Sequence, residues 1–195
     1  MDDPELVSVY GNLNLPVGSA SRPLVSLLLI AYNQERYVRA AIEGAFAQEY
    51  SPLEIILSDD CSPDRTFAIM EEMAREYRGE HKVLLVEHAK NLGLIGHVND
   101  LLERASGEIL VLAAGDDISL PNRVGSLVRR FAADSTAKLI HSNAVEIDKE
   151  GRVGAIQRPP ATTEYVDPEA LAASGSIYIG ATGAFKRELF ETFGP

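Results

Sequence analysis

The sequence predicts an α/β protein in which a mostly parallel sheet is flanked by helices. Short apolar runs of strand length alternate with segments whose apolar residues recur at helical spacing. The alternation is close and regular, and no repeat of fixed period underlies it. This pattern is typical of βαβ units, which build parallel sheets through right-handed crossovers.

The first strand is expected at residues 24–30, where the chain reads Leu-Val-Ser-Leu-Leu-Leu-Ile. A central parallel strand is buried on both faces, and a nearly continuous apolar run is its usual sequence. Four further runs are expected to form strands, at residues 53–58, 82–86, 109–113 and 137–142.

The first helix is expected at residues 35–48, because apolar side chains recur there every three or four positions. Later helices are expected from about residue 65 to 78, and at 95–105, 121–133 and 186–193. Ser62 or Asp64 is expected to cap the second helix, and Gly107 to end the third.

The 195 residues are enough for one substantial domain. Residues 1–22 are expected to be a flexible leader, and residues 23–195 a single domain. Within it, residues 151–175 lose the strand–helix rhythm and are expected to cross the surface.

Composition excludes several classes of protein. The formal net charge of −11 argues against nucleic-acid binding, which needs clustered Lys and Arg. The single cysteine, Cys61, cannot form a disulfide within the chain or a zinc cluster. No secretory signal is visible, and no apolar run is long enough to cross a bilayer, so a soluble chain without a membrane segment is expected.

Polar residues gather where three predicted strands end. Ala31-Tyr32-Asn33 and Glu35 follow the first, Asp59-Asp60 the second, and Asp116-Asp117 the fourth. Ligands of open parallel sheets bind at these carboxyl ends. Carboxylates placed together raise each other's pKa, and a divalent cation relieves that repulsion. Taken singly, each group could equally form an Asx turn or a helix cap, and only their joint occurrence favours a metal-bridged phosphate ligand.

The same segments resemble family 2 glycosyltransferases, from about residue 23 to the end. The matching stretches occur in the family's order, at residues 25–37 and 54–64, at Asn91, Gly93 and Asn99, at 107–109, at Asp116-Asp117, and at Gly180, 183–185 and 187–190. The resemblance implies a GT-A fold, which is Rossmann-like and binds nucleotide-diphosphate sugars. The last segments resemble the family's acceptor side.

The resemblance also implies roles for individual residues. The Ala31-Tyr32-Asn33 backbone and Glu35 would border the nucleotide base, Asp59 and Asp60 would contact it, and Asn91 would lie near the nucleotide. Asp116 would approach the ribose or the metal, and Asp117 would hold Mn²⁺ or Mg²⁺ against the diphosphate.

The activity implied is that of an inverting, metal-assisted hexosyltransferase. The donor would be a nucleotide sugar, with UDP favoured, and the acceptor a saccharide or lipid-linked saccharide. Polysaccharide biosynthesis is implied at the level of the family. A cytoplasmic location is implied, with peripheral attachment to the inner face of the membrane left open.

Three departures from the family pattern affect these expectations. Ala114 stands where the metal motif often begins with Asp, and Val98 where Arg is common. The general base of the family is expected beyond Pro195, so we expect a truncated chain that binds donor weakly and lacks turnover.

Two other functions are compatible with parts of the pattern. A non-catalytic nucleotide-sugar-binding module of the same fold would keep the architecture. A sugar nucleotidyltransferase is less favoured, because residues 31–35 contain neither the Gly nor the Lys of its phosphate loop. A dinucleotide-binding domain is disfavoured, since no G-x-G-x-x-G follows the first strand.

Overall fold

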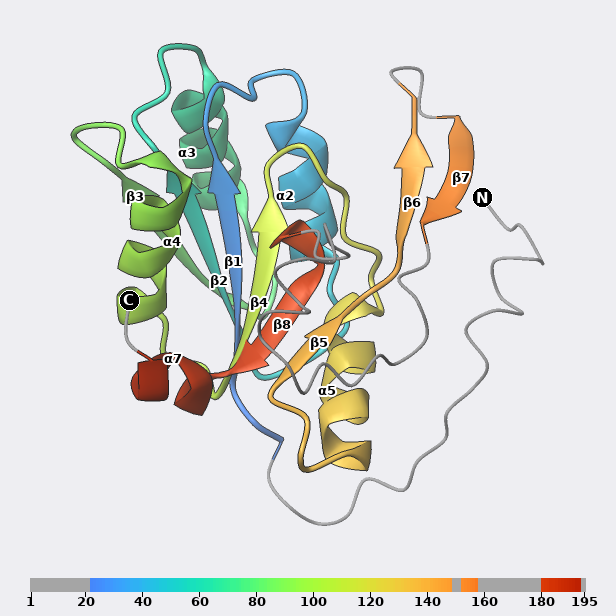
Figure 1. Cartoon of the computed structure of the whole chain (residues 1–195). Helices are drawn as coiled ribbons and strands as arrows, with labels where there is room; N and C mark the ends of the chain where they lie inside the picture. Colours follow the sequence, from blue (N-terminus) through green and yellow to red (C-terminus); the bar gives the residue numbers. More distant parts are fainter. Residues whose placement is uncertain (1–21, 149–151, 158–179, 194–195) are drawn as a thin grey trace, which may run out of the picture.

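A computed structural model of the chain describes residues 22–148, 152–157 and 180–193. Its central sheet has the strand order β3-β2-β1-β4-β8-β5 (Figure 1). Four neighbouring strands are parallel: β1 (Val25–Ala31), β2 (Leu53–Asp59), β3 (Lys82–Glu87) and β4 (Ile109–Ala114). The predicted mostly parallel sheet is therefore confirmed. The expected leader at 1–22 lies almost wholly outside the described residues, as does most of the excursion at 151–175.

Strand β8 (Gly183–Lys186) was not predicted. It lies between β4 and β5 (Leu139–His141) and is antiparallel to both. The sequence hides it because a four-residue strand beginning Gly-Ala has neither an apolar run nor an alternation of apolar and polar residues. A separate hairpin of β6 (Ala144–Ile147) and β7 (Val153–Gln157) was not predicted either.

Helices cover both faces of the sheet. Helices α2 (Val38–Phe46), α3 (Thr66–Glu76) and α5 (Arg123–Ala133) pack on one face. Helices α4 (Gly93–Arg104) and α7 (Arg187–Phe193) pack on the other.

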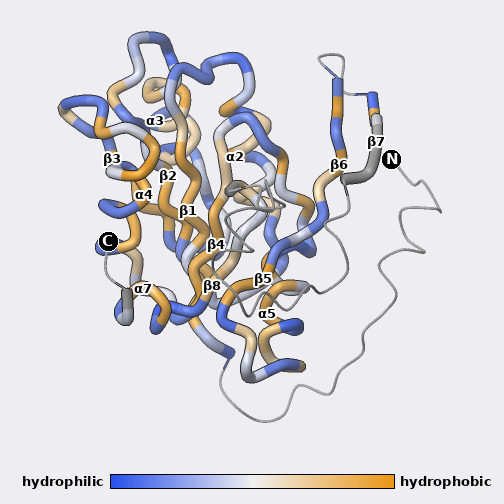
Figure 2. Tube along the Cα trace, in the orientation of Figure 1, coloured by the Kyte–Doolittle hydropathy of each residue, from blue (hydrophilic) through white to orange (hydrophobic). Residues whose placement is uncertain are grey.

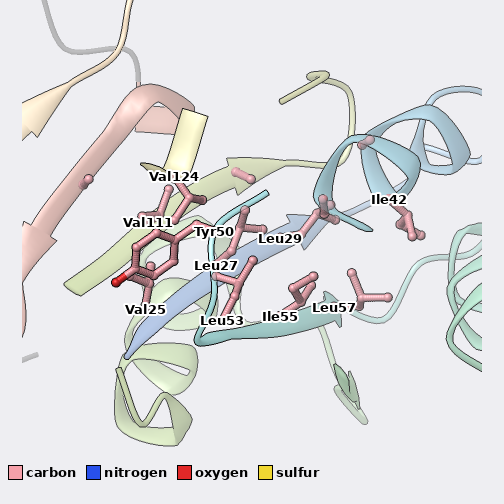
Figure 3. Packing of buried hydrophobic residues seen from close by; sticks show 14 of the residues in the cluster. Val25, Leu27, Leu29, Ile42, Tyr50, Leu53, Ile55, Leu57, Val111 and Val124 are labelled. Carbon is pink, nitrogen blue, oxygen red and sulfur yellow. The ribbon is translucent and has the colours of Figure 1, made fainter. Parts of the chain in front are cut away.

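The core lies between the sheet and these helices. Successive residues of β1 alternate between the two faces, as the strand period requires. Leu27 and Leu29 enter the α2 side, seen from close by in Figure 3, and Leu28 enters the α4 side. All three are at most 1% exposed. In Figure 2 strands β1, β2 and β4 are hydrophobic, whereas the loops at the carboxyl ends of β1 and β2 are hydrophilic.

Two local predictions need correction. The first helix begins at Val38 instead of residue 35, because the preceding residues bond to the neighbouring loop. Gly107 does not end a helix: α4 ends at Arg104. A Cβ at Gly107 would lie 2.4 Å from the backbone nitrogen of Ser26, so glycine there permits a close approach to β1.

Within the described ranges, no helix is both long enough and apolar enough to cross a membrane.

Candidate functional site

The loops that follow β1 and β2 are bonded to each other by side chains. Three successive backbone N–H groups of the first loop, those of residues 33–35, each donate to a side chain of the second. Their acceptors are Ser62 Oγ at 2.9 Å, Thr66 Oγ1 at 2.8 Å and Asp64 Oδ2 at 3.0 Å. The two loops therefore form one unit, which we call the paired loops (residues 32–35 and 59–66).

Bonds in the opposite direction complete this unit. The backbone N–H of Arg65 donates to Glu35 Oε2 at 3.0 Å. Asp64 Oδ1 accepts from both the backbone N–H and the hydroxyl of Thr66 at the start of α3. These bonds hold the pKa of Asp64 below its ordinary value despite partial burial, which raises it. The predicted cap by Ser62 or Asp64 is wrong, because the N-cap residue is Arg65 and no side-chain hydrogen bond caps the helix there. The positive φ of Asn33 (56°) and Cys61 (62°) gives each loop its sharp turn.

Asp59 and Asp60 are 1% and 2% exposed and bond to different segments. Asp59 accepts from the backbone N–H of Ser62 at 2.8 Å and from its hydroxyl at 2.5 Å. Asp60 accepts from the backbone N–H groups of Leu92 at 2.8 Å and Gly93 at 3.0 Å. Asn91 Oδ1 also accepts from Gly93, at 2.9 Å. Asp60 thus brings Asn91 beside the paired loops, as its predicted role requires.

Two histidines form a layer behind these carboxylates. His97, 3% exposed, bonds through Nε2 to Ser58 Oγ at 2.7 Å. The ring of His88 contacts the ring of His97 edge-on, with centroids 4.9 Å apart, and bonds to Asp100 at 3.0 Å. Burial lowers the pKa of His97, which favours its neutral form.

The loop after β4 (residues 115–122) approaches the paired loops at Gly115. A Cβ there would lie 2.5 Å from Gln34 Oε1 and 2.7 Å from Ala31 Cβ, so glycine permits this contact. Asp116 and Asp117 follow immediately, and both are exposed. Partial desolvation of its carboxyl group and the charge of Asp116 raise the pKa of Asp117, and Arg123 opposes the shift. The loop therefore presents two carboxylates that repel each other.

These carboxylates fit a divalent cation. Mg²⁺ is usually held by one or two carboxylates, with substrate phosphates completing its shell. Across the described ranges, no group of three or more His, Cys, Asp or Glu side chains could hold a metal. Ala114, at the end of β4, offers no third carboxylate. Asp116 and Asp117 thus match a cation shared with a phosphate ligand, and do not match a closed protein cage.

Arg123, at the start of α5, was missed by the sequence reading. Its guanidinium donates to the carbonyls of Leu112 at 2.8 Å and Ala181 at 2.7 Å, and to Ser119 Oγ at 2.9 Å. Nothing in the sequence signals this role, because an Arg in the first turn of a helix is usually a surface residue.

The structure brings together most of the predicted site residues, but not the last segment. Ala31, Tyr32, Asn33, Glu35, Asp59, Asp60 and Asn91 belong to the paired loops or contact them, and Gly115 brings Asp116 and Asp117 alongside. Tyr32 is 49% exposed beside them. Arg187, by contrast, donates to the carbonyls of Ala105 and Gly107, which precede β4. It therefore lies at the opposite end of that strand.

Comparison with known proteins agrees with this geometry. The family model "Glycosyl transferase family 2" matches residues 26–194. Putative glycosyltransferase EpsE of Bacillus subtilis is 30% identical over 172 residues, which are 88% of this chain and 59% of EpsE. Chondroitin synthase of Escherichia coli is 28% identical over 131 residues, 67% of this chain and 18% of the synthase. The chain thus spans less than two thirds of these relatives.

Solved structures give the same fold. Mannosyltransferase PcManGT of Pyrobaculum calidifontis, in complex with GDP-Man and Mn²⁺, has a TM-score of 0.66 and 23% identity, covering 98% of this chain and 54% of that one. Staphylococcus aureus TarS with UDP-GlcNAc has a TM-score of 0.62 and 18% identity, covering 86% and 46%. Both are glycosyltransferases of the GT-A fold. This chain has that fold and belongs to glycosyl transferase family 2.

Proposed function

We propose that this chain binds a nucleotide-diphosphate sugar, with UDP as its nucleotide, for transfer of the sugar to an acceptor hydroxyl. The observation that carries the proposal is the exposed, mutually repelling pair Asp116 and Asp117 beside the paired loops. Such a pair is costly without a cation, and a diphosphate completes the coordination of that cation. The GDP-Man bound with Mn²⁺ by PcManGT and the UDP-GlcNAc bound by TarS support a nucleotide-diphosphate sugar as the ligand, and TarS alone supports UDP as its nucleotide.

The paired loops would bind the base. The backbone of residues 31–33 would border the base. The exposed ring of Tyr32 and the exposed carboxylate of Glu35 would lie beside it. We propose that Asp60, with Asn91 nearby, contacts the base, since each carboxylate oxygen can accept a second hydrogen bond. Asp59 would act through Ser62, because it is still part of strand β2.

Asp116 and Asp117 would hold Mn²⁺ or Mg²⁺ against the diphosphate. A bound metal would act as a Lewis acid that stabilises charge on the leaving nucleoside diphosphate. The protein's part is to keep both carboxylates exposed and adjacent at the end of β4. Transfer would proceed by direct displacement with inversion, to a saccharide or lipid-linked saccharide acceptor.

We assign no described residue as the general base. Glu188 is paired with Lys138 at 2.5 Å, and both side chains are about half exposed. Glu191 is exposed on the same short helix. Neither residue lies at the carboxyl ends of the parallel strands, where the donor would bind.

Calorimetric titration with UDP tests the proposal. We expect saturable binding with Mn²⁺ present, loss of that binding with chelator, and loss again in Asp117→Ala. Glu71→Ala is the matched control, because it removes one carboxylate from the exposed face of α3 and should leave binding unchanged. Metal-independent binding of equal strength in wild type and Asp117→Ala would contradict the metal role.

A second candidate, a nucleotide-sugar-binding module without transferase activity, is favoured by one observation. Ala114 leaves the metal site with a single carboxylate pair. Such a module would bind UDP-sugar and release no UDP when acceptors are offered. Transfer of sugar to any saccharide acceptor, measured as UDP release, would rule it out.

A further inference from the structure

Arg123 joins strand β4 and the loop that follows it to a turn that lies 58 residues further along the chain. Its two terminal nitrogens bond to Leu112 in β4, to Ser119 in the loop after β4, and to Ala181 in the 3₁₀ turn η1 (Gly180–Thr182). We propose that Arg123 is a positioning residue. It fixes the Asp116-Asp117 loop relative to η1, the turn that directly precedes β8.

The position of this contact in the sheet explains why one side chain can do so. The ladder between β4 and β8 ends at Val111 and Ala184. The carbonyl of Leu112, one residue beyond the ladder, is bonded to Arg123. Arg123 thus continues the connection between β4 and the β8 segment after the backbone pairing has ended.

The geometry of guanidinium suits this task and that of ammonium does not. A planar fork can bond to several oxygens in fixed directions, whereas Lys presents a compact charge on a flexible chain. The described hydrogen bonds of Arg123 all go to neutral oxygens, so no carboxylate cancels its charge through them.

The enclosed Nε of Arg123 has no hydrogen-bond partner among the described residues. Leaving a buried N–H unpaired is unfavourable. The three bonds of the terminal nitrogens, to Leu112, Ser119 and Ala181, fix the guanidinium in place. The Nε group therefore cannot turn toward a partner of its own.

The consequence is a link between the metal loop and η1. Residues 183–190 follow η1 in the chain, and displacement of the turn would displace the start of β8 with it. The identity of Asp116 and Asp117 as metal ligands rests on the proposed function, but the link itself does not.

Arg187 provides a matched control. It also donates from its guanidinium to two backbone carbonyls next to β4, but at the strand's other end. Arg123→Lys and Arg187→Lys each keep the positive charge but lose the planar guanidinium and its several N–H donors. We would measure three properties of both variants in the 195-residue chain: the melting temperature, amide hydrogen exchange by peptide, and the Mn²⁺ concentration needed for UDP binding.

For Arg123→Lys we expect faster exchange in both 115–120 and 181–184, and an apparent Mn²⁺ affinity about tenfold weaker, as for loss of groups that orient metal ligands. For Arg187→Lys we expect lower thermal stability without either effect. If Arg123→Lys loosened only one segment, or neither, the proposed link would be wrong. If both segments loosened but the wild-type chain bound no UDP with Mn²⁺, the link would stand and the proposed function would fall.

Discussion

The paired loops and the loop after β4 meet at one end of the sheet, but they are built in opposite ways. In the paired loops, Ser62, Asp64 and Glu35 are all engaged by hydrogen bonds within the unit. In the loop after β4, Asp116 and Asp117 are exposed and repel each other. The carboxylates of one region already have hydrogen-bond partners within the fold, whereas those of the other are exposed to solvent. The difference separates carboxylates that stabilise the fold from carboxylates whose mutual repulsion a cation would relieve.

The largest expected effect tests that separation directly. Asp59→Ala removes the acceptor of both the backbone N–H and the hydroxyl of Ser62 in a buried position. We expect the free energy of unfolding to fall by about 2–3 kcal/mol, since two groups lose a charged partner. Urea denaturation measures this. Asp116→Ala is the control and should stay within about 0.5 kcal/mol of wild type. Equal losses in both variants would abolish the distinction.

A second substitution probes the contact between the two regions. Gly115→Ala would place a methyl group 2.5 Å from Gln34 Oε1 and 2.7 Å from Ala31 Cβ. We expect a loss of about 1–2 kcal/mol, because overpacking forces neighbours to move. Gly125→Ala, on α5, is the control, since its nearest contact would be the end of the Arg129 side chain at 3.4 Å. An unchanged stability in Gly115→Ala would show that the loop after β4 can retreat freely.

Acidification should lower the free energy of unfolding because of the buried His97. The pKa of His97 in the folded chain is lowered, so the unfolded chain takes up a proton first as the pH falls through about 6.5. Stability is therefore full above that pH and decreases below it, until the folded state is protonated as well. The half-buried His141 contributes with the same sign, because burial lowers its pKa as well. Unfolding curves between pH 8 and 5 measure the slope, which should be shallower in His97→Gln. An unchanged slope in that variant would contradict this assignment.

The smallest expected effect has the opposite sign. Asp117 has a raised pKa, so its ionised form is disfavoured in the folded chain at neutral pH. Asp117→Asn should therefore raise the free energy of unfolding, by no more than about 0.5 kcal/mol because the residue is exposed and screened by solvent. With Mn²⁺ and UDP added, the order should reverse, since only wild type gains from binding. A variant less stable than wild type without ligand would show that Asp117 already has a favourable partner.

The sequence was sufficient for the parallel strands and the places where they end. Apolar runs of strand length alternate there with segments of helical spacing, which is typical of βαβ units, and the carboxyl ends of parallel strands must share one edge. The antiparallel β8 was not predicted because it is four residues long and begins with Gly-Ala. The role of Arg123 was not predicted because one of its partners, the carbonyl of Ala181, lies 58 residues away in the chain. The sequence also could not separate Asp59-Asp60 from Asp116-Asp117, because what differs between the two pairs is their bonding and burial.

The mutual bonding of the paired loops bears on how these loops could be exchanged between family members. The backbone N–H groups of residues 33–35 donate to the side chains of residues 62, 64 and 66. The carboxylate of Glu35 accepts from the backbone N–H of Arg65. If the first loop alone were grafted into a relative, its N–H donors would lack their acceptors. If the second loop alone were grafted, its acceptors would lack their donors. The two loops therefore have to be exchanged together, as one piece of chain that includes the α2 helix and the β2 strand between them.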